Sequence, residues 1–225
     1  MTLHFLREMD RLNERLIEIG NEVETQVSAA FLAVIQLDEA AARRVIRDDV
    51  EVDNHEIQME EECLKLLALY QPVASDLRLI VAVLKINTDL ERIGDHAKNM
   101  AEAAIKLSAA PATEIPESMY AIYKQAKLML RKTLLAFVET DRGLAEKVLK
   151  MDDEVDKMCS AELPHQIELI QKHPEDAAQR LMLLSVCRQL ERIGDHASNI
   201  AEDVVYLLSG DIIRHGENGT MKSQG

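Results

Sequence analysis

The octapeptide LERIGDHA occurs twice in this chain, at residues 90–97 and again, unchanged, at residues 190–197. The likeness continues beyond it, because Asn99 recurs as Asn199 in the same position after the octapeptide. An identical segment at a long fixed spacing indicates an internal duplication in which each copy is one supersecondary unit. We therefore expect two related halves.

Apolar residues recur every three or four positions through most of the chain, as they do on the buried face of a helix. Only 8 Gly and 5 Pro occur in 225 residues, and aromatic residues make up 3%. A β-rich protein of this length would need many more turn residues. The pattern predicts an all-α fold with six long helices, at about residues 3–37, 39–70, 75–108, 117–139, 142–172 and 175–209.

The segment 109–118, AAPATEIPES, contains two prolines and lacks helical periodicity, so it separates the two halves. Three helices precede it and three follow it. We predict two tandem, pseudo-symmetric three-helix bundles, at residues 1–112 and 113–210. Residues 211–225 are Gly-rich and polar, and we expect a flexible tail there.

The chain is acidic, with 40 Asp and Glu against 26 Lys and Arg and a formal net charge of −14. This charge repels nucleic acid and anionic lipid, and it favours cations and basic protein surfaces as partners. The three cysteines form no CxxC pair, and the chain has neither a signal-peptide pattern nor an apolar run of about 20 residues. We expect a cytoplasmic protein with reduced thiols that reaches a membrane only through its partners.

The repeated segment carries oxygen ligands at helical spacing. Glu91, Asp95 and Asn99 fall within about 80° of one another on a helix, and apolar residues occupy the opposite face. Upstream, Asp49 and Asp53 have the same spacing, and the second half repeats this pair as Asp152 and Asp156.

Carboxylates at this spacing repel one another by about 0.2–0.5 kcal/mol per pair, and a hard cation between two such helices would remove the repulsion. A ligand set without Cys or His favours magnesium, calcium, manganese or iron over a structural zinc site. The alternative is a solvated acidic face, and Lys98 falls inside the proposed ligand arc. The recurrence of the same carboxylates in both copies favours metal binding.

The two copies differ downstream of the aspartate pair. Glu56 and Glu60 of the first half correspond to Cys159 and Leu163 of the second, so we expect fewer ligands in the second site. Separately, Glu162 and His165 have the spacing found in di-iron bundles, but Pro164 lies between them and no second copy exists.

The duplicated ERIGDHAxNxAE, the upstream DxxxD and the stretch QPVASDLRLIVAVLK together resemble the PhoU family of phosphate-transport accessory and regulatory proteins. The resemblance covers nearly the whole chain. It implies two tandem three-helix bundles that often assemble as a homodimer. It also implies a negative regulator of phosphate uptake and of the phosphate-starvation response, without catalysis of its own. The implied partners are a phosphate ABC transporter, through its ATPase subunit, and a membrane sensor histidine kinase.

The resemblance further implies metal ions, multinuclear clusters included, held by E/DxxxD motifs from two helices of each bundle. Iron, manganese, magnesium and zinc are the candidate ions. Carried over by position, the implied ligands are Asp49, Asp53, Glu91, Asp95 and Asn99 in the first half and Asp152, Asp156, Glu191, Asp195 and Asn199 in the second. Two other interpretations stay open, a ferritin-like di-iron oxidoreductase and a purely structural helical adaptor.

Overall fold

A computed structural model describes residues 3–111 and 113–210, and every long element in these two ranges is an α-helix. A short 3₁₀ turn, η1 (Pro174–Asp176), leads into the last helix. The all-α prediction is confirmed, and the predicted helix boundaries lie within about two residues of the observed ones. The predicted tail falls outside the described residues. The helices are α1 (Leu3–Gln36), α2 (Glu39–Tyr70), α3 (Ala74–Ser108), α4 (Glu117–Glu139), α5 (Arg142–Lys172) and α6 (Ala177–Ser209).

Aspartates begin the second helix of each half. The Asp38 side chain accepts a hydrogen bond of 2.9 Å from the Ala41 amide at the start of α2. Asp141 accepts one of 3.0 Å from the Leu144 amide at the start of α5. Each cap satisfies an amide that has no partner within its own helix. The local sequence therefore sets where α2 and α5 begin.

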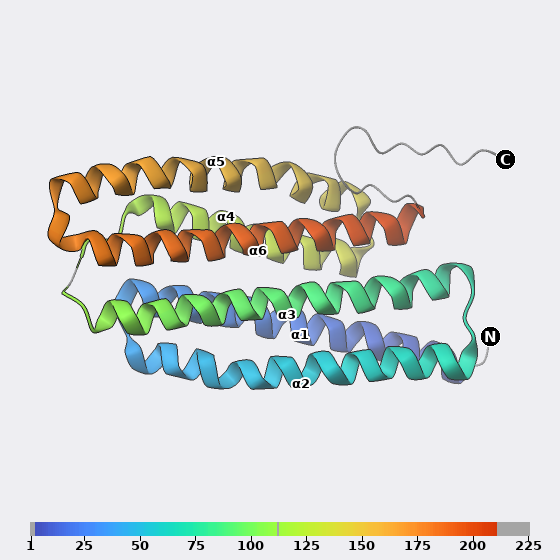
Figure 1. The fold of residues 1–225 in the computed structure, drawn as a ribbon. Coiled ribbons are helices and arrows are strands. Elements are labelled where there is room, and N and C mark those ends of the chain that lie inside the picture. Colours follow the sequence, from blue (N-terminus) through green and yellow to red (C-terminus); the bar gives the residue numbers. More distant parts are fainter. Residues whose placement is uncertain (1–2, 112, 211–225) are drawn as a thin grey trace.

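The six helices form two three-helix bundles that lie side by side (Figure 1). In the first, α1, α2 and α3 pack on one another, and in the second α4, α5 and α6 do the same. The bundles meet along α3 and α6, with a smaller contact between α1 and α4. The tandem, pseudo-symmetric arrangement is as predicted. No helix in the described ranges is both long and apolar enough to cross a membrane.

One apolar core runs through both bundles. At the α1–α4 contact the rings of Phe31 and Tyr123 stack with centroids 4.1 Å apart. Within the first octapeptide, Ile93 and Ala97 are fully buried. The carboxylates on the opposite side of that turn, Glu91 and Asp95, are therefore left partly exposed, on the side of α3 that the helical spacing predicts.

Candidate metal centre

In each bundle the aspartate pair of the second helix faces the octapeptide of the third. A Cβ atom built on Gly94 of α3 would lie 3.4 Å from Val52 Cγ1, 3.7 Å from Asp49 Oδ1 and 3.1 Å from Gln26 Oε1. The small residue lets α2 approach α3 closely here.

The second bundle repeats this packing with equivalent residues. A Cβ atom on Gly194 of α6 would lie 3.5 Å from Val155 Cγ1, 3.7 Å from Asp152 Oδ1 and 3.8 Å from Met129 Cε. Asp152 thus stands where Asp49 stands in the first bundle, and Met129 stands in the place of Gln26. Both aspartate pairs lie beside their octapeptide, as the sequence predicted.

In the first bundle the buried aspartate already has two donors. Asp49 is only 1% exposed, and its Oδ1 accepts a 2.8 Å hydrogen bond from Nε2 of Gln26 in α1. The Nζ of Lys98 lies 2.6 Å from Asp49 Oδ2. The hydrogen bond to Asp49 raises the pKa of Lys98, so the lysine stays charged. These residues do not fit a metal ion at Asp49, because an ammonium occupies the position that a cation would take.

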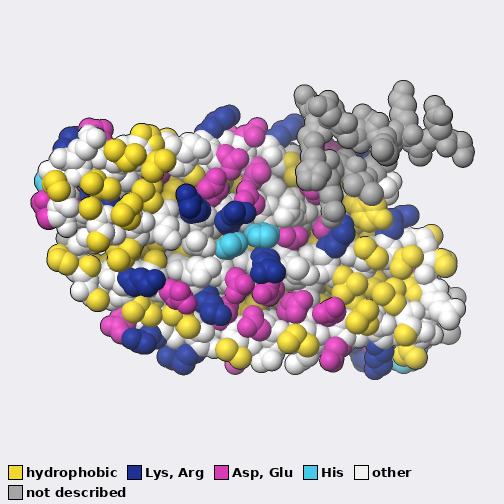
Figure 2. All heavy atoms as spheres, in the orientation of Figure 1, with side chains coloured by type: hydrophobic (Ala, Val, Ile, Leu, Met, Phe, Trp, Pro, Cys, Tyr) yellow, Lys and Arg dark blue, Asp and Glu magenta, His cyan; other side chains and the backbone are white. Residues whose placement is uncertain are grey.

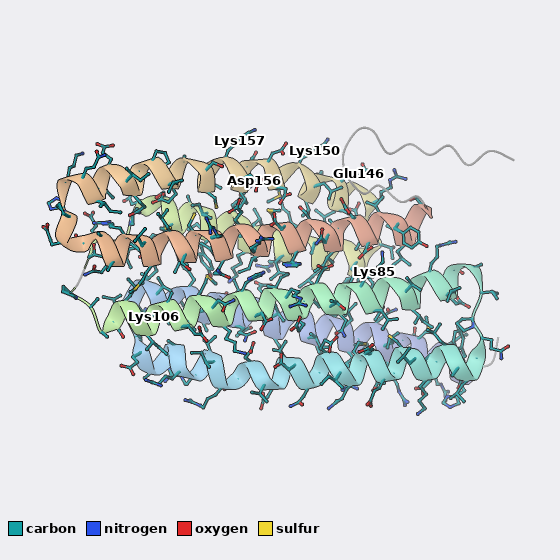
Figure 3. The ribbon with its side chains drawn as sticks, viewed as in Figure 1. Lys85, Lys106, Glu146, Lys150, Asp156 and Lys157 are labelled. Atoms are coloured by element: carbon teal, nitrogen blue, oxygen red, sulfur yellow. The ribbon has the colours of Figure 1, made fainter. Side chains whose placement is uncertain are left out.

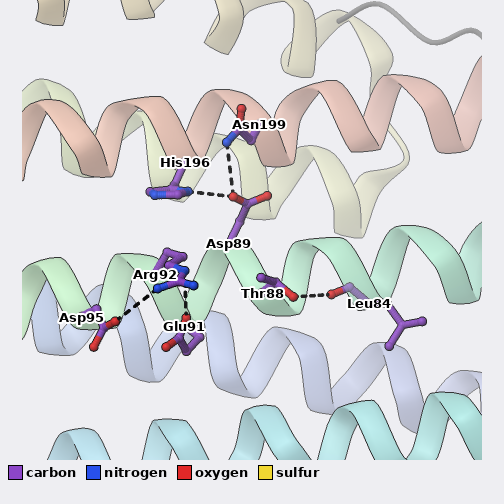
Figure 4. A network of polar contacts seen from close by, with 8 residues as sticks. All are labelled: Leu84, Thr88, Asp89, Glu91, Arg92, Asp95, His196 and Asn199. Atoms are coloured by element: carbon purple, nitrogen blue, oxygen red, sulfur yellow. Dashed lines mark hydrogen bonds and ion pairs between the residues drawn. The ribbon is translucent and has the colours of Figure 1, made fainter.

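The other carboxylates of the first bundle gather around this ion pair. Burial raises the pKa of Asp53, and so does the neighbouring charge of Asp49. Burial also raises the pKa of Glu91, with a further contribution from Asp95. Arg92 lies 3.5 Å from Glu91 and 3.8 Å from Asp95, and its side chain is more than half exposed (Figure 4).

In the second bundle three carboxylates converge. Asp152, Asp156 and Asp195 each offer an oxygen within 4.8 Å of the others, the one such group of His, Cys, Asp or Glu in residues 3–111 and 113–210. Burial raises the pKa of Asp152 to about 6, with like charges from Asp156 and Asp195 adding to the effect. Glu191 is close enough that Asp156 helps to raise its pKa, after burial. Asp156 lies on α5, in the upper bundle of Figure 3.

The ammonium and the amide that hold Asp49 have no equivalents around Asp152. Met129 replaces the glutamine, and Ser198 replaces the lysine. Ser198 is 8% exposed and faces Asp152, where its hydroxyl lowers the pKa of that carboxyl against the effect of burial. Ser198 Oγ and the buried Asp152 Oδ1 make no well-directed hydrogen bond to a described residue. In the first bundle the same holds for Gln26 Oε1 and for Asp49 Oδ2, but Asp49 Oδ2 has the Lys98 ammonium beside it. Together with the partly exposed carboxylates of Asp156 and Asp195, Ser198 Oγ and Asp152 Oδ1 form a ligand set that suits a hard cation.

Asn99 and Asn199 lie at the seam between the bundles, directed away from the carboxylates. The Asn199 amide donates to Asp89 Oδ1 at 3.3 Å, and His196 Nδ1 lies 2.7 Å from the same oxygen (Figure 4). In the other copy, Asn99 donates to Gln189 of α6 at 3.5 Å. The structure thus assigns both asparagines to the packing of α3 on α6 instead of to the ligand sets.

The two octapeptides face each other across this seam. The rings of His96 and His196 lie with centroids 5.3 Å apart. His96 Nδ1 lies 2.9 Å from the Gln189 side-chain oxygen, and burial lowers the pKa of His96. Figure 2 shows two adjacent histidines in the middle of this face, with acidic side chains gathered on either side of them.

Glu162 and His165, which have the spacing found in di-iron bundles, do not lie in a metal-ligand cluster of the described residues. Glu162 is 2% exposed and accepts a 2.6 Å hydrogen bond from Gln166 on the same helix. His165 Nδ1 lies 3.4 Å from Glu162, while its own side chain is nearly half exposed. This pair lies apart from the converging aspartates, and α5 continues through Pro164.

Sequence reasoning missed three residues that set the character of the two sites, namely Gln26, Lys98 and Ser198. Lys98 was seen only as a charge inside the ligand arc, although it pairs with an aspartate on a different helix. An alignment of the two halves would have revealed the difference. Lys98, directly after the first octapeptide, aligns with Ser198 after the second, and Gln26 in the first helix aligns with Met129 in the fourth.

Comparisons with known proteins match the chain in both halves. The PhoU domain model matches residues 16–104 and again residues 121–204. The phosphate-specific transport system accessory protein PhoU homolog of Pseudomonas putida is 36% identical over 214 residues, covering 94% of this chain and 83% of that protein. The protein of the same description from Pseudomonas aeruginosa is 37% identical, covering 94% of this chain and 88% of its own length.

Solved structures agree with the fold. The crystal structure of PhoU from Pseudomonas aeruginosa superposes with a TM-score of 0.89 at 36% identity, over 92% of this chain and all of that one. The phosphate transport system regulatory protein PhoU from Streptococcus pneumoniae gives a TM-score of 0.88 at 28% identity, over 94% of this chain and all of that one.

Proposed function

The chain belongs to the PhoU family, and from this premise we propose that it is a metal-binding regulatory adaptor of phosphate homeostasis. It restrains phosphate uptake and the phosphate-starvation response when phosphate is plentiful. It acts by binding other proteins, without catalysing a reaction. The observation that carries the proposal is the match of both halves, over nearly the full length of chain and relatives, to phosphate-transport accessory proteins.

The proposed partners are the ATPase subunit of a phosphate ABC transporter and a membrane sensor histidine kinase. The names of the relatives, which refer to a phosphate-specific transport system, support the transporter as a partner. The net charge of −14 favours basic surfaces on either partner. We place the protein in the cytoplasm, as a homodimer, where it meets the inner faces of both membrane proteins.

Metal binding is the second part of the proposal. The converging oxygens of Asp152, Asp156 and Asp195 support it, since iron, manganese and magnesium all accept carboxylate ligands. A bound cation would neutralise charges that repel one another across α5 and α6. It would stiffen the middle of the second bundle and change the charge presented there to a partner.

Deletion of the gene in the native organism tests the regulatory part. We expect alkaline phosphatase activity to rise in phosphate-rich medium, and the intact gene on a plasmid to restore repression. Unchanged phosphatase in the deletion strain would refute a role in phosphate regulation. Deleting the sensor kinase as well should abolish the rise. A rise that persists without the kinase would refute the kinase as a partner.

A further inference from the structure

The two carboxylate sites differ in what neutralises their buried aspartate. Asp49 in the first bundle has an ammonium at 2.6 Å on one oxygen and an amide donor at 2.8 Å on the other. Asp152 in the second bundle has a neutral serine and a methionine in the equivalent places. The duplication therefore kept the aspartates and changed the residues that face them.

The Lys98 ammonium makes a metal ion unfavourable in the first bundle. A divalent ion at Asp49 would have to displace the ammonium of Lys98, whose side chain is 33% exposed, from an aspartate that is only 1% exposed. Two cations within a few ångströms repel each other strongly where water is scarce. The remaining carboxylates, Asp53, Glu91 and Asp95, do not converge to within 4.8 Å in this part of the described structure.

The second bundle has the opposite character. Three carboxylates converge, and the Ser198 hydroxyl and Asp152 Oδ1 are buried without a well-directed hydrogen bond to a described residue. Asp49 Oδ2 of the first bundle also lacks one, but the Lys98 ammonium lies 2.6 Å from it. The Arg192 guanidinium lies 3.9 Å from Asp195, on a side chain that is 61% exposed. An exposed arginine at that distance contributes little and can swing into solvent.

We propose that Lys98 is a built-in cation that replaces a metal ion in the first bundle, so that only the second bundle, through Asp152, Asp156 and Asp195, binds a divalent ion. The inference rests on the metal-binding part of the proposed function and makes it asymmetric. The two octapeptides are identical, and the residue that follows each of them, lysine or serine, decides which copy accepts metal.

The test uses the purified, full-length protein and Mn²⁺ as the probe. Binding is followed by electron paramagnetic resonance of free Mn²⁺, and its location by paramagnetic broadening of amide NMR signals. In the wild-type protein we expect the strongest broadening around Asp152 and Gly194, with the effect falling with distance across the seam and weakest around Asp49. This measurement needs no substitution, so it stands even where a variant fails to fold.

Reciprocal exchanges make the inference sharper. Ser198→Lys should weaken Mn²⁺ binding by at least about 10-fold, whereas Ser185→Lys, which adds the same charge at an exposed position of α6, should leave it within about 2-fold. Lys98→Ser combined with Gln26→Met copies the second site into the first. It should add Mn²⁺ binding that broadens the signals around Asp49.

Several results would overturn the inference. They are broadening around Asp49 as strong as that around Asp152 in the wild-type protein, tight binding that survives Ser198→Lys, and the absence of Mn²⁺ binding from the wild-type protein. None of these touches the phosphatase assay, so the inference and the regulatory role can fail separately.

Discussion

The ion pair between Lys85 of α3 and Asp203 of α6 is expected to hold the two bundles together. Lys85 Nζ lies 2.5 Å from Asp203 Oδ1, and the aspartate side chain is only 6% exposed. The same ammonium lies 5.4 Å from the centroid of the Tyr206 ring. The pair links residues 118 positions apart, in the two halves of the duplication. Lys85 is labelled in Figure 3.

Replacing Lys85 by Met keeps most of the apolar stem and removes the ammonium that lies beside the buried Asp203 carboxylate. Breaking a fully buried pair in this way costs about 3–5 kcal/mol. The Lys85 side chain is 35% exposed, so water can reach the carboxylate in its absence, and we reduce the expected cost to about 2 kcal/mol.

Urea unfolding followed by far-UV circular dichroism measures this cost. With a slope of about 2 kcal/mol per molar urea, the midpoint of Lys85→Met should fall by about 1 M. The equivalent position in the second half is the exposed Ser185, and Ser185→Met should change stability by less than about 0.5 kcal/mol.

A double-mutant cycle isolates the pair itself. Lys85→Met, Asp203→Asn and the combination should give a coupling energy of about 1–2 kcal/mol, since the second change costs little once the first is made. Additive effects, with a coupling below about 0.3 kcal/mol, would refute the view that this ion pair stabilises the seam.

Three further perturbations test the packing and burial. Gly94→Ala should destabilise the protein by about 1 kcal/mol, because the new Cβ would lie 3.1 Å from the Gln26 side-chain oxygen. Gly194→Ala would make only ordinary contacts, from 3.5 Å, and should be neutral or stabilising by up to about 1 kcal/mol. Thermal unfolding measures both variants, and equal effects would contradict the difference in packing. Asp38→Ala and Asp141→Ala should each cost about 1 kcal/mol as lost helix caps, also read from thermal unfolding. Burial raises the pKa of the Cys63 thiol to about 12. At pH 8, Cys63 should therefore not react with iodoacetamide in the native protein but should react in the urea-unfolded protein. Mass spectrometry of the peptide that contains Cys63 measures the labelling in each state.

The fold was predictable because its main determinants are local. Apolar spacing gave the helices, Asp38 and Asp141 marked two of their starts, and the repeated octapeptide indicated two related bundles. The six helices therefore agree with the sequence to within about two residues. The exact division of the chain into domains stays a prediction.

The candidate site was predictable only in part. Helical spacing finds residues that share a face of one helix, and it correctly put Glu91 and Asp95 together. It cannot tell which residue of a neighbouring helix lies opposite, because that depends on how the helices are aligned lengthwise. The contact of Lys98 with Asp49 and the contact of Asn199 with Asp89 both depend on this alignment, so only the structure reveals them.

The polar seam also bears on how the chain is made. A ribosome completes α1, α2 and α3 before α6 has been synthesised, so α3 waits for its partner. The side of α3 that later meets α6 carries Lys85, Asp89, His96 and Asn99, all of which bond to α6 in the finished protein. Water can hydrate these groups in the meantime. A nascent first half thus presents a hydrated stripe at this position, which disfavours premature sticking between neighbouring unfinished chains.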